Sequence, residues 1–232
     1  MASVSENLTL ISYNCEYAND IRVPFMKQLF SQCDFLCLQE HGLFKSKLPW
    51  LRILGDDVCF HGVSAMDEGQ LLRGRPHGGA AIVWHGGMQH QVTPVPWNST
   101  RLCAVTVNVG AETLLIINVY MPCDDGLNNR NVLEYSDILN DIDTICSITN
   151  ATMLCVGGDF NTDLRRATPQ TRALSDFCNE NDLFCCAYDE QTNFDFTYCS
   201  KIDGRRSWID HCVISNNLRG ELGGYVSIDY MC

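Results

Sequence analysis

The sequence predicts a single α/β domain built on a pair of mixed, largely antiparallel β-sheets. Apolar, strand-like segments recur along the chain, amphipathic helical segments lie between them, and two of the strands are joined by the short turn "GAE". Strands that pair as hairpins and are mixed with helices favour mixed sheets over a purely parallel one. Because no linker, repeat or low-complexity tract divides the 232 residues, we expect one domain over 1–232.

The expected strands are apolar or alternating runs, and most of them end in a polar residue. They are LTLISYN (8–14), DFLCLQE (34–40), GAAIVWH (79–85), RLCAVTVNV (101–109), TLLIINVYMP (113–122), ATMLCVGGDFN (151–161), SWIDHCVIS (207–215) and GYVSID (224–229). Strand ends that meet at one rim of a sandwich can assemble a site from distant parts of the sequence. The polar residues that could do so are Asn14, Glu40, Tyr120, Asp159 with Asn161, and Asp210.

Three segments between these strands have the apolar spacing of amphipathic helices. They are 19–31, 129–148 and 169–181. The last is opened by Thr168 and Pro169, residues that suit the N-cap and the first helical position.

The composition indicates a globular protein inside the cell. No apolar run approaches the roughly 18 residues that span a bilayer, and the start, "MASVSENLTL", lacks the features of a secretory signal. Most of the 14 cysteines lie in apolar segments without zinc-finger spacing, which favours buried free thiols in a reducing compartment. We expect a nuclear or cytoplasmic protein that is not secreted and has no membrane partner.

A net charge of −12 argues against broad electrostatic binding to nucleic acid. It leaves room for a metal-dependent site that acts on a phosphodiester, because such a site needs carboxylates of its own. Basic residues gather only in small groups, which are at least as consistent with solvated loop charges: Arg73 and Arg75, Arg165 and Arg166, and Lys201, Arg205 and Arg206.

The sharpest local feature is "GGDFN" (157–161), a glycine turn after an apolar strand. In an extended segment the side chains of Asp159 and Asn161 share a face and point into one cleft. A carboxylate there could bind or orient an attacking water, and the amide could donate to a phosphoryl oxygen. The alternative is an ordinary Gly-Asp turn in which Asn161 serves the local backbone.

Other side chains at strand ends or in turns could also carry chemistry. Glu40 ends a buried run, and one glutamate can anchor Mg²⁺, although a solvated strand end is the alternative. Tyr120 ends a strand before a proline and could donate to a phosphate oxygen or fill the core. His77, before a glycine pair, could approach a substrate from the rim or be a turn residue. We expect His41 to be a loop neighbour of Glu40 without a ligand role.

Taken together and in this order, the segments resemble the endonuclease/exonuclease/phosphatase superfamily. The match covers nearly the whole chain and consists of Asn14, "QE" (39–40), "GGAAI" (78–82), "NVYMP" (118–122), "GDFN" (158–161) and "SWID" (207–210). Six ordered motifs make the resemblance highly specific. Within the superfamily, the sequence looks most like the endonuclease domains of non-LTR (LINE-type) retrotransposons.

The resemblance implies a DNase I-like, four-layer α/β sandwich in which helices flank the two sheets. It also implies Mg²⁺-dependent (or Mn²⁺-dependent) hydrolysis of a DNA phosphodiester, with target DNA nicked for retrotransposition and a reverse transcriptase domain in a longer polyprotein. Glu40 and Asn14 would hold the metal. The other roles implied by the motifs are water activation by Asp159, contact with the scissile phosphate by Asn161 and Tyr120, and contact with the DNA side by Thr197 and Ser207. The early motif departs from many relatives, which carry a glycine close behind the asparagine, where this chain has Cys15 and Glu16.

The segment "SWIDHCVIS" places Asp210 directly before His211. Neighbours on a strand point to opposite faces, so we expect Asp210 in the cleft and His211 away from it. "SKID" (200–203) imitates the motif, but only "SWID" runs into an apolar strand. In the resembling family the aspartate orients a histidine from a final S-D-H motif, which does not occur before Cys232. We expect the domain to be truncated before that motif, without its last strand end and one histidine short.

Two other functions stay open at this point. One is a phosphatase or phosphodiesterase of the same fold that acts on inositol phosphates or a lipid. The other is a folded, inactive remnant that binds DNA or a protein partner.

Overall fold

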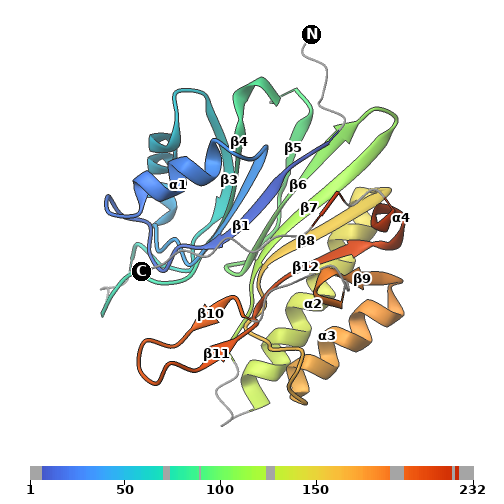
Figure 1. Ribbon diagram of the computed structural model, residues 1–232. Coiled ribbons are helices and arrows are strands. Elements are labelled where there is room, and N and C mark those ends of the chain that lie inside the picture. The colour runs from blue at the N-terminus through green and yellow to red at the C-terminus, as the bar shows by residue number, and fades with distance from the viewer. Residues whose placement is uncertain are drawn as a thin grey trace.

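The computed structural model describes residues 7–69, 74–88, 90–123, 129–188, 196–220 and 223–224 of the chain. Two β-sheets pack face to face, and helices cover the outer face of each sheet (Figure 1). This is the four-layer α/β sandwich that the sequence and its resemblance predict. The sheets are mixed, and antiparallel strand pairs outnumber parallel ones.

The first sheet is built from the first third of the chain. Its elements are β1 (Leu10–Asn14), α1 (Val23–Phe30), β2 (Phe35–Gln39), the 3₁₀ segment η1 (Lys45–Leu54), β3 (Val58–Val63) and β4 (Ala80–His85). The strand order is β1-β2-β4-β3, and only β1 and β2 are parallel. The helix α1 and the segment η1 cover its outer face, where Met26, Leu38 and Leu51 are fully buried.

The second sheet is larger and carries the longer helices. Its elements are β5 (Val92–Val95), β6 (Leu102–Val109), β7 (Glu112–Tyr120), α2 (Asn129–Thr149), β8 (Met153–Asp159), α3 (Pro169–Glu180), β9 (Leu183–Cys185) and β12 (Asp210–Ser215). The strand order is β5-β6-β7-β8-β12-β9, with β7 and β8 parallel. A hairpin of β10 (Tyr198–Cys199) and β11 (Arg206–Ser207) precedes β12, and the short helix α4 (Asn216–Arg219) follows it.

A polar bridge crosses the apolar layer between the two sheets. Gln39 of β2 donates to Oδ1 of Asn118 of β7 at 2.6 Å, and Nδ2 of Asn118 donates to two backbone carbonyls of the first sheet at 2.9 Å. Both side chains are fully buried. Glu40 and Tyr120 lie one and two residues further along these strands, so the bridge fixes the spacing of the sheets beside the strand ends that matter below.

The bounds of several elements differ from those predicted. The helix expected over 19–31 begins only at Val23, because Oδ1 of Asn19 accepts the N–H groups of Ile21 and Arg22 and holds a turn there. The strand expected over 207–215 begins at Asp210, since the chain before it pairs within the hairpin.

Some elements had no clear sequence signal, and some expectations cannot be compared. β3 contains a glycine, β5 contains Pro94, and β9 and β10 are very short, so none shows a sustained alternation. The strand expected over 224–229 lies outside the described residues apart from Gly224, and so does Arg73.

In the described part of the chain, no helix is both long enough and apolar enough to cross a membrane. None of the cysteines described there forms a disulfide, and most are buried or half-buried, as the composition predicts.

Candidate active site

Polar strand ends from both sheets meet at the lower end of the molecule in Figure 1. On the second sheet, Tyr120, Asp159 and Asp210 stand side by side in register on β7, β8 and β12. On the first sheet, Asn14 ends β1 and Glu40 directly follows β2. The structure thus brings these five residues to one rim, although they come from the ends of five different strands.

Asn14 links the two sheets at this rim. Its Nδ2 donates to Oε1 of Glu40 at 3.1 Å and to Oδ2 of Asp159 at 2.8 Å. Its Oδ1 accepts the backbone N–H of Glu16 at 3.0 Å, which fixes the orientation of the amide. One amide nitrogen therefore holds together two carboxylates that would otherwise repel each other.

The segment "GGDFN" leaves the strand earlier than expected. β8 ends at Asp159 and Asn161 adopts a left-handed φ of 48°, so the two side chains do not share a face of an extended segment. The Asn161 N–H donates to Oδ1 of Asp159 at 2.9 Å, and its Nδ2 donates to the Met121 carbonyl at 2.9 Å. Asn161 thus hydrogen-bonds to the local backbone, as in the ordinary Gly-Asp turn that was the alternative. Asp159 still faces Asn14. Gly158 must be glycine, since an added Cβ would collide with the Val119 carbonyl oxygen.

Tyr120 contacts the first sheet through its hydroxyl, which hydrogen-bonds to the Glu40 carboxylate. The Arg101 guanidinium lies over the tyrosine ring, 5.1 Å from its centre, and pairs with Glu134 of α2 at 2.9 Å. Burial first, and then the charge of Glu40, raise the pKa of Tyr120 far above its usual value. The phenol therefore remains a hydrogen-bond donor at neutral pH.

Asp159 and Asp210 are cross-strand neighbours whose charges disfavour each other. Burial, followed by the charge of Asp210, raises the pKa of Asp159 well above its usual range, against the opposing hydrogen bonds from Asn161 and Asn14. Burial raises the pKa of Asp210 to about 6, although a hydrogen bond from Thr197 lowers it. Carboxyl groups with raised pKa values are suited to taking up a proton near neutral pH.

The strand geometry separates Asp210 from His211 as expected. His211 is 2% exposed and lies on the helix-covered face, where its Nε2 contacts the Thr162 carbonyl at 2.7 Å. The hydroxyl of Thr197 accepts hydrogen bonds from the N–H groups of Ile209 and Asp210 at 3.0 and 3.1 Å. Thr197, expected on the DNA side, therefore stabilises the start of β12. "SWID" leads into β12, whereas "SKID" lies in the turn between β10 and β11.

Ser207 and His77, the other expected substrate-binding residues, contact residues outside the set of rim carboxylates. Ser207 is buried, and its hydroxyl accepts a hydrogen bond from Nη2 of Arg166 at 3.1 Å. Arg166 also lies 3.7 Å from the Asp163 carboxylate. His77 is exposed, with its Nδ1 3.4 Å from the Arg75 carbonyl oxygen.

Sequence reasoning missed two residues that orient members of this set. Glu16 fixes Asn14 through its backbone N–H and adopts a left-handed φ of 45°, a conformation that favours glycine. The signal in the sequence was that Cys15 and Glu16 stand where many relatives carry a glycine. Arg101 covers Tyr120, but its anchor Glu134 lies 33 residues away on another element, so no local pattern could reveal it.

The donor set fits a hard divalent cation. Glu40 supplies the carboxylate, and Mg²⁺ needs only one or two because it keeps several waters. Asn14, expected as a second ligand, positions Glu40 through Nδ2, because its Oδ1 accepts the Glu16 N–H. His41 is fully buried and uses both ring nitrogens on backbone groups at 3.0 Å, so it is not a ligand. In the part of the chain that the structure describes, no group of three or more His, Cys, Asp or Glu residues is arranged to hold a metal ion.

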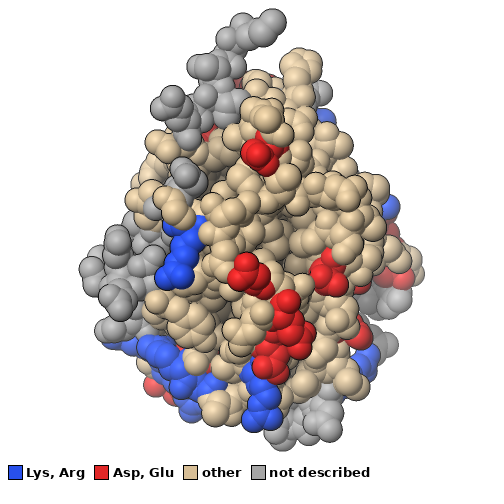
Figure 2. Space-filling model, turned by 90° about the vertical axis from the view of Figure 1, so that its right-hand side faces the viewer, with Lys and Arg blue, Asp and Glu red and all other residues tan. Residues whose placement is uncertain are grey.

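Charge is distributed unevenly around this end of the molecule. Figure 2 shows Lys and Arg side chains along the lower edge of one face of the molecule, and Asp and Glu side chains over the middle of the same face. Separately from the face drawn in Figure 2, the β10–β11 hairpin and its turn, on the left in Figure 1, carry Lys201, Arg205 and Arg206.

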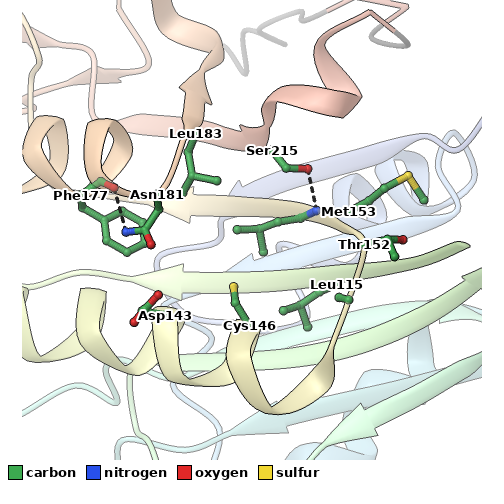
Figure 3. A pocket seen from close by; sticks show the side chains of 11 residues that line it. Leu115, Asp143, Cys146, Thr152, Met153, Phe177, Asn181, Leu183 and Ser215 are labelled. Carbon is green, nitrogen blue, oxygen red and sulfur yellow. Dashed lines mark hydrogen bonds between the residues drawn. The ribbon is translucent and has the colours of Figure 1, made fainter.

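A cavity of about 170 Å³ lies at the opposite ends of the strands, between α2, α3 and β9 (Figure 3). Its lining is mainly apolar and includes Leu115, Cys146 and Phe177. None of the candidate site residues lines it, so we do not connect it with the chemistry of the rim.

Comparisons with known proteins agree with this architecture. A sequence model described as "Endonuclease/Exonuclease/phosphatase family" matches residues 11–226. No curated protein is significantly similar in sequence. The AP endonuclease LMAP from Leishmania major has a similar structure, with a TM-score of 0.71, 13% identity, and 92% of this chain and 80% of that chain covered. The 3′ phosphatase NExo from Neisseria, determined with a product DNA hairpin, gives 0.66, 17%, 92% and 89%.

The endonuclease domain of TRAS1, a telomere-specific non-LTR retrotransposon, gives a TM-score of 0.63 at 12% identity, with 92% of this chain and 88% of that domain covered. At such identities these likenesses establish the shared fold. The family match spans nearly the whole chain and includes every strand that carries the rim except the first residue of β1. The chain therefore belongs to the endonuclease/exonuclease/phosphatase family.

Proposed function

We propose that this chain is a divalent-metal-dependent nuclease that hydrolyses a DNA phosphodiester and nicks target DNA as a retrotransposon endonuclease does. The observation that carries the proposal is the hydrogen-bonded set in which Asn14 joins Glu40 to Asp159 at the ends of both sheets. Phosphodiester hydrolysis needs a cation, an activated water and donors to the phosphate within one small volume, and this rim contains candidates for each role.

The contacts suggest a division of labour among the rim residues. Mg²⁺ or Mn²⁺, held by Glu40 with Asn14 beside it, would supply Lewis-acid stabilisation of the charge on the phosphate. Asp159 takes a proton from the attacking water, since burial and its acidic neighbour raise its pKa. The Tyr120 hydroxyl donates to a phosphate oxygen, with Asn161 as a second candidate donor at the same rim. Asp210 keeps the proton affinity of Asp159 high through its charge.

Two observations support DNA as the substrate. The hairpin that adjoins Asp210 carries Lys201, Arg205 and Arg206, which provide local positive charge despite the acidic net charge of the whole chain. Proteins of the same fold include an AP endonuclease and a retrotransposon endonuclease domain. As part of the same proposal, the domain works inside the cell, with a reverse transcriptase domain in a longer polyprotein.

A plasmid-nicking assay in Mg²⁺ tests this function. We expect the parent chain to convert supercoiled plasmid to open circles, and Asp159→Asn to lower the rate by about 10²–10⁴-fold, the usual contribution of a general base. Glu40→Gln should raise the Mg²⁺ concentration for half-maximal nicking by about tenfold or more. Asp137→Asn, an exposed carboxylate on α2, is the matched control and should nick like the parent.

The other two functions give different outcomes in the same experiment. Release of phosphate from inositol phosphates or phospholipids, without nicking, would replace the nuclease proposal by a phosphatase of this fold. DNA binding without any turnover, with Asp159→Asn indistinguishable from the parent, would identify an inactive remnant.

A further inference from the structure

We propose that Glu16 is a positioning residue that ties the β10–β11 hairpin to Asn14 and so holds the hairpin at a fixed spacing from the candidate active site. The tether is a structural property of the chain. Its effect on catalysis rests on the proposed function.

The hairpin reaches from one side of the rim to the other. At its base, the Thr197 hydroxyl accepts the N–H of Asp210 at 3.1 Å, which joins the hairpin to the second sheet. At its turn, Nζ of Lys201 lies 2.9 Å from Oε2 of Glu16, a residue 185 positions earlier in the chain that follows β1 of the first sheet. The hairpin therefore contacts both halves of the sandwich.

Glu16 is itself held firmly against the first sheet. Its Oε2 accepts from Nη2 of Arg22 at 3.1 Å, and Nη1 of Arg22 donates to the Tyr13 hydroxyl at 3.2 Å. Its backbone N–H donates to Oδ1 of Asn14 at 3.0 Å. The same residue thus fixes the metal-side amide through its backbone and the hairpin through its side chain.

Among the described residues, the other hydrogen bonds of the hairpin turn lie within the hairpin itself. Only two residue pairs join β10 to β11, and so short a ribbon is marginal by itself. Ile202 at the turn is 99% exposed, and the side chain of Lys201 is 65% exposed. Of the ion pairs among the described residues, Lys201–Glu16 is the one that joins the hairpin to the first sheet, whereas Arg205–Asp203 lies within the hairpin turn.

Loss of the Glu16 carboxylate should affect substrate binding more than the chemical step. The backbone N–H that orients Asn14 remains in Glu16→Gln, so the rim keeps its geometry while the hairpin moves more freely. The ion pair is partly exposed, and pairs of that kind contribute modestly. We therefore expect effects of about two- to fivefold, a KM increase with kcat nearly unchanged.

The tether is tested by hydrogen exchange of residues 198–207 and by maleimide labelling of Cys199, an exposed thiol on β10. Both rates should rise about two- to fivefold in Glu16→Gln and in Lys201→Met. Lys201→Arg keeps a cation opposite Glu16 and should leave both rates near the parent values. Asp20→Asn removes an exposed carboxylate from the same loop as Glu16 and is the matched control, with parent rates expected.

The possible results separate the tether from the proposed function. Parent-like exchange and labelling in Glu16→Gln would overturn the tether, whatever the chain hydrolyses. Faster exchange together with an unchanged KM, or with kcat falling as much as kcat/KM, would overturn the positioning role. If the parent cleaves no phosphodiester, the proposed function fails, and the exchange rates alone still decide whether Glu16 holds the hairpin.

Discussion

Two carboxylates of the candidate site are each followed by a histidine. A different backbone conformation directs each histidine side chain away from the site. Glu40 adopts a left-handed φ of 51° after β2, and this turn sends His41 inward, where both ring nitrogens contact backbone groups at 3.0 Å. Asp210 stays in the extended strand β12, so alternation alone places His211 on the opposite face, where Nε2 contacts a backbone carbonyl at 2.7 Å. The placement of His41 depends on a left-handed residue before it, whereas the placement of His211 needs only the ordinary alternation of a strand.

The comparison shows that, in each adjacent pair, the carboxylate belongs to the candidate site and the histidine stabilises the fold. Burial lowers the pKa of both His41 and His211 to about 4, so both rings are neutral at pH 7 and can serve as structural hydrogen-bond partners. The carboxylates beside them have their oxygens at the rim. Variants of the carboxylates should therefore change activity, and variants that disturb the histidines should change stability.

The largest effect is expected from Asp210→Asn. We expect it to lower the nicking rate by about 10²-fold or more, because it removes the charge that keeps the proton affinity of Asp159 high. The same change should raise the free energy of unfolding at pH 7 by about 1–3 kcal/mol, because burial raises the Asp210 pKa to about 6 and makes its charged form costly. Nicking and urea unfolding measure the two effects, and loss of activity with loss of stability would contradict the division of roles.

The next effect tests whether the buried His41 ring packs against Gly79. Gly79→Ala should lower the free energy of unfolding by about 2–4 kcal/mol, because the residue adopts φ +87° and a Cβ would lie 2.5 Å from Cε1 of His41. Gly74 has φ +86° with no atom within 4 Å of an added Cβ, so Gly74→Ala carries only the backbone cost, about 1 kcal/mol. Equal losses in urea unfolding would show that His41 does not occupy the space above Gly79.

The third effect is a pH dependence that belongs to His211. Its folded-state pKa of about 4 lies below the ordinary 6.5, so the unfolded chain binds more protons between these values and stability falls as the pH drops through this range. Between pH 7 and pH 5 the loss from this residue should be about 2 kcal/mol. The ring is packed against Phe160 and Trp208, and the nearby charge of Asp163, which favours protonation, does not offset the burial.

A non-titrating variant isolates that contribution. His211→Leu should show a smaller loss of unfolding free energy than the parent between pH 7 and pH 5, by about 2 kcal/mol. Parallel curves for the parent and the variant in urea unfolding would mean that His211 is protonated as easily in the folded protein as in the unfolded chain.

The local periodicity of the apolar segments predicted an α/β domain with mixed sheets, and the family resemblance implied the four-layer sandwich. The sequence also predicted that Asn14, Glu40 and Asp159 meet, through the order of the motifs. It could not predict that Asn161 leaves the face of Asp159 and bonds to the Met121 carbonyl, because the rule for residues two apart assumes an extended chain and β8 ends at Asp159. Nor could it pair Glu16 with Lys201, since an ion pair across 185 residues leaves no local pattern.

The smallest effect ranks the two histidines against each other. His41→Leu should lower the free energy of unfolding at pH 7 by about 1–2 kcal/mol more than His211→Leu does. The first change leaves two buried backbone groups, the Leu43 N–H and the Val63 carbonyl, without their side-chain partner, and the second leaves only the Thr162 carbonyl. His211→Leu also removes a buried Nδ1 that has no hydrogen-bond partner among the described residues, which reduces its net cost. Urea unfolding of both variants decides the ranking. An equal or reversed order would mean that the turn at Glu40 does not depend on the His41 ring, and that alternation along a strand anchors a buried histidine as strongly as a left-handed turn does.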